Sequence, residues 1–197
     1  MAEVKLVPHS ALGPLGASRR IGRLSDSAGV TLRERDDIGF LSIAAERGEA
    51  SAVLARLGDA LGLGIPDNFR RVGDGVSAIG PGRWLLDGLL AAAGQEYALR
   101  DLLAGIAGVV DESDGWVVLD LSGARVGDAL AKLVPIDLHP KSFREGDLAL
   151  TIAEHINVRL WRLSGGNAYR LAAPRSYAES LFRRLASAAS EYGLEIA

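Results

Sequence analysis

Three acidic residues, Asp111, Glu112 and Asp114, cluster near the middle of the chain and could do chemistry together. Carboxylates are the ligands that hard metal ions prefer and the groups that general acid–base catalysis uses. Acidic residues are equally typical of a solvated hairpin end, and Asp114-Gly115 is a strong hairpin signal. Side chains alternate along a strand, so Asp111 and Glu112 point to opposite faces. We therefore expect a hairpin end here.

The three histidines, His9, His139 and His155, are the natural candidates for a general base or a metal ligand. No pair has the i, i+4 spacing of a helical metal site, and no HExxH motif occurs. His139 lies between Leu138 and Pro140, where we expect its ring to hydrogen-bond locally and hold a turn. His155 lies at a predicted hairpin turn, and His9 lies in the N-terminal segment.

The segment Gly73-x-Gly75-x-x-Ala78 partly matches a dinucleotide-binding fingerprint. Its context does not fit, because no long apolar strand precedes it and Gly80-Pro81-Gly82 interrupts the helix that should follow. The sequence also contains no phosphate-binding loop and no GxSxG nucleophile motif. These patterns assign no catalytic, cofactor-binding or metal-binding residue to this chain.

The three tryptophans, Trp84, Trp116 and Trp161, each lie in a predicted strand. A tryptophan in a strand usually packs in the core or on a sheet face. Tryptophan is also enriched at protein interfaces, so contact with a partner is the alternative.

Composition limits the class of protein. The chain has 197 residues, no cysteine, and a net charge of −3. Disulfides, thiolate metal sites and cysteine nucleophiles are excluded, and the acidic balance argues against nucleic-acid binding. No uncharged apolar run reaches the roughly 18 residues that a membrane helix needs, and no signal peptide is recognisable. We expect a globular cytoplasmic protein that binds neither nucleic acid nor membrane.

The stretch from Trp116 to Pro140 indicates how the fold is organised. Residues 116–121 form a predicted strand that is apolar at every position except Asp120, so the strand belongs in the middle of a sheet or under a helix. A predicted helix follows, with Val126, Leu130 and Leu133 on its buried stripe. Pro135 ends that helix, and the chain then runs extended.

The remaining elements alternate between strand pairs and helices. The first half is expected to contain strands 30–35 and 39–44, a helix over 46–61, a hairpin of strands 76–79 and 83–87, and a helix over 95–107. The second half is expected to contain strand 108–111, strands 148–154, 157–163 and 168–172, and a helix over 176–192. Ser176-x-x-Glu179 predicts a capping box at the start of the last helix. The predicted class is α+β, with mixed, largely antiparallel sheets and ββα-type pseudo-repeats.

Residues 1–28 are expected to form an irregular N-terminal arm, because their apolar residues show no sustained period. Such an arm is either a frayed terminus or a segment that lies on a partner. Residues 29–197 are expected to form a single α+β domain, which a pseudo-repeat would divide into halves 29–107 and 108–197.

Several short motifs in order, covering roughly residues 38–192, resemble one known family. They are Leu61-Gly62-Leu63-x-x-Pro66-x-Asn68, Gly80-Pro81-x-x-Trp84-Leu85-Leu86, Val110-Asp111-Glu112-Ser113-Asp114-Gly115, Leu121-Ser122-Gly123-Ala124-Arg125, Leu130-Ala131-Lys132, Pro135-Ile136-Asp137-Leu138-His139-Pro140, Leu160-Trp161-Arg162-Leu163 and Pro174-Arg175-Ser176-Tyr177-Ala178. In their order and spacing they resemble the gamma subunit of heterotetrameric sarcosine oxidase.

The resemblance implies a subunit without its own catalysis, assembled with alpha, beta and delta subunits in an oxidoreductase complex. The family's complex oxidatively demethylates N-methylglycine and passes the one-carbon unit to tetrahydrofolate. The resemblance places FAD, FMN, NAD, tetrahydrofolate and zinc in the other subunits and no cofactor in this chain. It also implies a fold similar to the folate-binding domain of aminomethyltransferases.

Two other functions compete with that expectation. One is a stand-alone folate-dependent one-carbon transferase, which needs a carboxylate near the pterin that the sequence does not identify. The other is a folate- or metabolite-sensing module, because similarity of fold does not transmit function. Similar subunits also serve enzymes for other N-methylated amino acids, so the substrate of the complex stays open.

Overall fold

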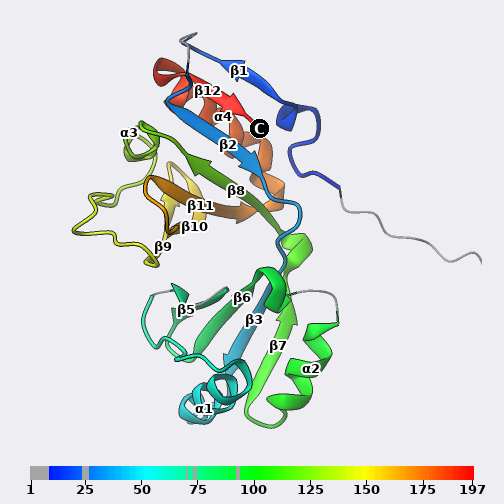
Figure 1. Cartoon of the computed structure of the whole chain (residues 1–197). Helices are drawn as coiled ribbons and strands as arrows, with labels where there is room; N and C mark the ends of the chain where they lie inside the picture. Colours follow the sequence, from blue (N-terminus) through cyan, green and yellow to red (C-terminus); the bar gives the residue numbers. More distant parts are fainter. Residues whose placement is uncertain (1–8, 24–26, 70, 73–74, 92–93) are drawn as a thin grey trace, which may run out of the picture.

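The computed structural model describes residues 9–23, 27–69, 71–72, 75–91 and 94–197, which form two β-sheets with helices against them (Figure 1). The seven-stranded sheet has the order β1-β12-β2-β8-β11-β10-β9, and the five-stranded sheet has the order β4-β5-β6-β3-β7. Only β12 and β2 pair in parallel among the described strands, and every other pairing there is antiparallel. The predicted α+β class with mixed, largely antiparallel sheets is therefore confirmed.

The elements have the following bounds. The seven-stranded sheet contains β1 Arg19–Ile21, β2 Val30–Glu34, β8 Trp116–Ser122, β9 Leu148–Ala153, β10 Ile156–Arg162, β11 Ala168–Pro174 and β12 Leu194–Ile196. The five-stranded sheet contains β3 Phe40–Ala45, β4 Arg71–Val72, β5 Val76–Gly80, β6 Arg83–Asp87 and β7 Ala107–Asp111. The helices are α1 Ala50–Leu61, α2 Gln95–Leu102, α3 Val126–Ala131 and α4 Ala178–Ala189.

Three apolar cores follow from the alternation of side chains along the strands. The outer face of the seven-stranded sheet packs on α3 and α4, and the outer face of the five-stranded sheet packs on α1 and α2. A third core lies between the sheets, where Phe40 and Leu85 meet Val118, Trp161 and Ala172. Each sheet is thus covered by helices on one side and contacts the other sheet on its inner side.

Strand β8 has the position that its sequence predicts. It lies between β2 and β11, and its alternate residues Val117, Leu119 and Leu121 are buried in the core under the helices. Val118 lies on the opposite, inner face and is also buried. A strand that is apolar on both faces is therefore explained by burial on both faces.

The chain crosses between the sheets twice, at residues 35–39 and 112–115. The two crossings are bonded to each other, because Glu112 N donates to Phe40 O at 2.9 Å and Phe40 N donates to Ser113 Oγ at 3.1 Å. The first crossing leads from β2 in the seven-stranded sheet to β3 in the five-stranded sheet, and the second leads from β7 back to β8. The two sheets therefore do not coincide with the halves 29–107 and 108–197, whose pseudo-repeat stays a prediction.

Two predicted helices are too long. Helix α1 begins at Ala50 instead of residue 46, because Gly48 has a left-handed φ of +90° and Glu46 N is bonded to Ile106 O at 2.8 Å. Helix α2 ends at Leu102 instead of residue 107, because Gly105 has a φ of +79° and the chain from residue 107 pairs with β3. Left-handed glycines and sheet pairing override the apolar periodicity in both cases.

The predicted capping box at Ser176 and Glu179 is wrong. Residues 175–177 form a 3₁₀ turn, and α4 begins at Ala178 without a side-chain cap at Tyr177. Glu179 instead accepts hydrogen bonds from Arg183, one turn along the helix, at 2.7 and 3.0 Å. Within the predicted helix over 176–192, Tyr177 is exposed, whereas Leu181 and Leu185 are buried.

The described part of residues 1–28, expected to be an irregular arm, contains one short strand that joins a sheet. Strand β1 pairs with β12 at the edge of the seven-stranded sheet, and the side chain of Leu12 is buried in the core under the helices. Glu34 anchors the segment, accepting hydrogen bonds from Ser10 Oγ and Ala11 N, both at 2.6 Å. A three-residue strand carries too little apolar periodicity to be recognised from the sequence.

Candidate functional site

The acidic cluster lies at the second crossing between the sheets and not at a hairpin end, so that part of the sequence interpretation is wrong. Strands β7 and β8 belong to different sheets. The two-residue hairpin turn typical of Asp-Gly requires a left-handed glycine, and the backbone of Gly115 is not left-handed. Asp111 Oδ1 accepts hydrogen bonds from Ser113 N at 2.9 Å and from Ser113 Oγ at 2.6 Å. Asp111 and Asp114 are exposed.

Glu112 joins a polar cluster on the inner side of β8 and β10. Its Oε2 atom accepts from Arg159 Nη2 at 3.1 Å and from Trp116 Nε1 at 3.2 Å. The Arg159 guanidinium lies over the Trp116 ring, 3.8 Å from its centroid. Together with the acidic cluster these side chains line an open pocket of about 580 Å³.

Arg159 is a largely buried cation that lines this pocket. Its side chain is 12% exposed, and burial lowers its pKa while the Glu112 carboxylate opposes that effect. Its Nη1 atom is buried and has no hydrogen-bond partner among the described residues. A buried cationic donor without an acceptor is costly, so the arginine has an unused capacity for an acceptor oxygen.

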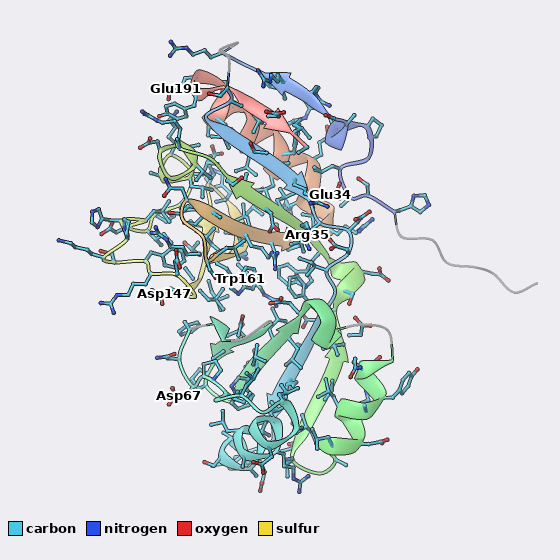
Figure 2. All side chains as sticks on the ribbon, viewed as in Figure 1. Glu34, Arg35, Asp67, Asp147, Trp161 and Glu191 are labelled. Carbon is cyan, nitrogen blue, oxygen red and sulfur yellow. The ribbon has the colours of Figure 1, made fainter. Side chains whose placement is uncertain are left out.

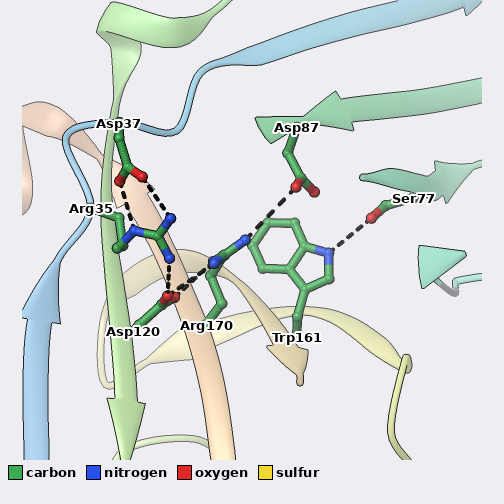
Figure 3. A network of polar contacts seen from close by, with 7 residues as sticks. All are labelled: Arg35, Asp37, Ser77, Asp87, Asp120, Trp161 and Arg170. Carbon is green, nitrogen blue, oxygen red and sulfur yellow. Dashed lines mark hydrogen bonds and ion pairs between the residues drawn. The ribbon is translucent and has the colours of Figure 1, made fainter. Parts of the chain in front are cut away.

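A second polar network links the two sheets (Figure 3). The carboxylate of Asp120 accepts from Arg170 Nε and Nη2 at 2.7 and 2.9 Å, and from Arg35 Nη1 at 2.7 Å. Arg170 Nη1 also lies 3.7 Å from Asp87 Oδ1 at the end of β6, and the Asp87 residue is 1% exposed. One carboxylate of β8 is thereby shared by two arginines, and one arginine spans both sheets.

Arg35 and Asp37 extend this network to the surface at the first crossing. Arg35 Nε and Nη2 donate to the two oxygens of Asp37 at 2.6 and 2.7 Å, a bidentate pair. These hydrogen bonds raise the pKa of Arg35 and lower the pKa of Asp37 to about 2. Arginines that stay protonated and are held by carboxylates do not transfer protons, so the network fixes the sheets rather than performing acid–base catalysis.

The tryptophans have structural positions. Trp161 points into the layer between the sheets (Figure 2), stacks on Phe40 at 6.0 Å, and donates from Nε1 to Ser77 Oγ at 2.9 Å. Trp84 is buried under the helices of the five-stranded sheet and donates from Nε1 to Pro66 O at 2.8 Å. Core packing is confirmed for both, and Trp116 is half-buried at the pocket described above.

The histidines do not come together. His139 is exposed, and its Nδ1 atom accepts from Lys141 N at 3.2 Å, which confirms the predicted role in a local turn. His155 is exposed in the tight turn between β9 and β10, as predicted. The backbone carbonyl of His9 accepts a hydrogen bond from Arg175. No group of three or more His, Cys, Asp or Glu side chains could hold a metal ion among the described residues.

The glycine-rich segment is not a dinucleotide loop where it is described. Gly73 lies outside the described residues, and Gly75 precedes strand β5 instead of a helix. A Cβ atom at Gly75 would lie 2.2 Å from Asp87 O, so glycine is needed there for close packing against β6.

Among the described helices none is long and apolar enough to span a membrane.

Sequence reasoning missed the charged residues of the inner layer. Asp120 was visible as the single charged position of an apolar strand, and Arg170 interrupts β11 in the same way. The register places the two directly opposite each other. A lone charge in each of two apolar strands is the signal that could have predicted a buried ion pair, although not its link to Asp87 or Arg35.

Comparison with known proteins identifies relatives. Residues 45–191 match the model of the sarcosine oxidase, gamma subunit family. The chain is 31% identical to the sarcosine oxidase subunit gamma of Corynebacterium sp. (strain U-96), over 93% of this chain and 91% of the relative. It is 34% identical to the sarcosine oxidase subunit gamma of an Arthrobacter species, over 75% of this chain and 74% of the relative.

Solved structures agree with this relationship. A chain of heterotetrameric sarcosine oxidase from Corynebacterium sp. U-96 superposes with a TM-score of 0.80 and 29% identity, covering 93% of this chain and 95% of that chain. The glycine cleavage system aminomethyltransferase T from Bartonella henselae superposes with a TM-score of 0.58 and 15% identity, over 80% of this chain and 45% of that one. The second likeness concerns the fold alone and confirms the expected resemblance to aminomethyltransferases.

Proposed function

Because the chain belongs to the sarcosine oxidase gamma subunit family, we propose that it is a non-catalytic, structural subunit of a heterotetrameric sarcosine oxidase. One observation carries this proposal: a chain of heterotetrameric sarcosine oxidase superposes on this protein over nearly the whole length of both. A shared backbone over 93% of this chain and 95% of that chain supports assembly in the manner of the relative.

The chemistry of the inner layer supports a structural role. Its charged side chains Arg35, Asp120 and Arg170 are engaged in hydrogen bonds with one another. Catalytic groups need access to a substrate, whereas these charged side chains are paired with one another and mostly buried. The chain thus contributes a rigid double-sheet body to the complex.

The proposed complex oxidatively demethylates N-methylglycine and passes the one-carbon unit to tetrahydrofolate. We assign FAD, FMN, NAD, tetrahydrofolate and zinc to its other subunits, and alpha, beta and delta subunits as the partners of this chain. We place the complex in the cytoplasm. A different N-methylated amino acid is the alternative substrate, and it depends on the catalytic subunits alone.

The experiment is purification of the tagged full-length chain from its native host, followed by an absorption spectrum of the eluate. The proposal predicts larger chains in the eluate and a flavin spectrum that bleaches when sarcosine is added without oxygen. A flavin spectrum that bleaches only with another N-methylated amino acid would change the substrate and keep the structural role. A colourless chain eluting alone would overturn the proposal.

A titration of the purified free chain tests the two alternatives, the stand-alone one-carbon transferase and the folate-sensing module. Either of them requires the free chain to bind tetrahydrofolate. Titration of the purified chain, followed by fluorescence of its tryptophans, distinguishes them from the structural subunit, for which no saturable change is expected.

A further inference from the structure

The edge of the seven-stranded sheet at β9 lacks the protection that the other edges have. Its sequence from Leu148 to Ala153, LALTIA, has no charged residue and no proline. The opposite edge strand, β1, carries two arginines, and β4 has only two residues. At β7, Arg100 Nε donates to the backbone oxygen of Val109 at 3.2 Å. Natural sheets usually blunt an edge with charge, shortness or cover, and β9 has none of these along its second half.

Two large apolar side chains stand on this edge. Leu150 is 48% exposed and Ile152 is 42% exposed, although Leu148 on the same face is buried between the sheets. Side chains two residues apart share a face, so one apolar row runs from the core out to the surface. An exposed apolar row continuous with a core is typical of a protein interface.

The backbone of the same residues is open. Leu148 N donates to Phe69 O at 3.1 Å, on the side of β9 that faces away from β10. The N–H and C=O groups of a strand residue in an antiparallel pair point to one side, which alternates along the strand. Leu150 and Ile152 therefore direct theirs to the open side, where the described part of the chain offers them no backbone partner.

A cationic donor lies beside this edge. Arg159 is the cross-strand neighbour of Leu150, and within the described part of the chain its buried Nη1 atom has no hydrogen-bond partner. Arg159, Leu150, Ile152 and Trp116 line a mostly apolar pocket of about 430 Å³. The pocket thus combines room for an apolar side chain with one charged donor, and a carboxylate is the strongest acceptor for that donor.

We propose that β9 receives an extended segment of another subunit of the complex, which pairs along residues 150–152 as an added strand. The segment places an apolar side chain in the pocket beside Trp116 and brings a carboxylate to the Arg159 side chain that lines it. Main-chain pairing supplies affinity in this mode of recognition, and the pocket supplies specificity. The inference rests on the proposed function, since it takes its partner from the same assembly.

The first test measures hydrogen exchange of the amides in residues 148–153, in the free full-length chain and in the purified complex. The added strand predicts that the amides of Leu150 and Ile152 exchange at least about tenfold more slowly in the complex, because they gain backbone acceptors. Equal exchange in both states would overturn the proposal.

The second test compares Ile152→Lys with the matched control Val110→Lys, both measured by the partner subunits retained on the tagged chain. Val110 is 54% exposed on β7, at an edge of the other sheet. The proposal predicts about tenfold weaker retention for Ile152→Lys, as for a central interface residue, and unchanged retention for Val110→Lys. Equal retention by Ile152→Lys and the unchanged chain would refute the docking site.

The two proposals fail in different ways. If the unchanged chain retains no partner, the proposed function itself is wrong. If the unchanged chain retains its partners and the β9 amides and Ile152→Lys behave like the controls, only the docking site is wrong. A free chain that dimerises and loses its dimer on Ile152→Lys would replace the other subunit with a second copy of this chain.

Discussion

Replacing Asp120 with alanine removes the carboxylate on which the inner ionic network depends. Asp120 accepts three hydrogen bonds of 2.7 to 2.9 Å from Arg35 and Arg170, and its side chain is only 21% exposed. After the change, Arg170 stays buried with Asp87 at 3.7 Å. Breaking a buried pair by removing one partner costs about 3–5 kcal/mol when the remaining charge is uncompensated, and here Asp87 compensates Arg170 in part.

Partial exposure of Asp120 places the expected loss at the lower end, about 3 kcal/mol of unfolding free energy. For a chain of this length such a loss lowers the melting temperature by roughly 6–12 °C. Urea unfolding followed by circular dichroism measures the loss directly. The control is Glu179→Ala, which breaks an exposed pair with Arg183 on α4 and should cost less than about 1 kcal/mol.

A double variant separates the ion pair from its surroundings. Asp120→Leu with Arg170→Met removes the buried arginine together with its carboxylate and should recover part of the lost stability, whereas full recovery is not expected because Asp87 loses the arginine 3.7 Å away. If Asp120→Ala lowers stability by less than 1 kcal/mol, or if the double variant is as unstable as the single one, the network does not hold the sheets together as described.

Four further outcomes are expected. Leu119→Asp should abolish the cooperative unfolding transition in circular dichroism, since it buries a charge in the core. Trp161→Phe should cost about 1–2 kcal/mol in urea unfolding, because it leaves the buried hydroxyl of Ser77 without its donor. Asp37 has a folded-state pKa of about 2, below its ordinary value. Its contribution to stability is therefore present above roughly pH 4 and is lost as the pH falls through 2. Asp37→Asn should flatten that part of the curve of stability against pH. Deletion of residues 1–23 removes β1 and an apolar side chain of the core, and should lower the melting temperature of the free chain instead of leaving it unchanged.

Much of the fold follows from local patterns. The two-sided strand β8, the hairpin of β5 and β6, and the successive strands β10 and β11 are found as expected, and Gly165 and Gly166 form the turn between the last two. In the last turn both glycines have positive φ, which only glycine adopts at little cost. The apolar periodicity of a strand and the residue types of a turn each involve only a few neighbouring residues, so these elements can be predicted from the sequence.

The strands with which β7 and β8 pair could not be predicted in the same way, since the two belong to different sheets. Asp114-Gly115 favours a tight turn, but whether the flanking strands pair with each other is decided by contacts far along the chain. Leu41 pairs with Asp111, and Leu119 pairs with Leu171. The candidate pocket depends on the same long-range register, because Arg159 meets Glu112 only after the crossing places β7 and β8 in separate sheets.

The native mass of the assembly tests the central claim most directly. A native mass spectrum of material purified through a tag on this chain should show one species whose mass is the sum of four different chains, one of them this chain of 20.7 kDa. Collisional activation should release this chain without loss of the flavin mass from the remainder. A spectrum that contains this chain alone, or only multiples of its own mass, would contradict its role as a structural subunit.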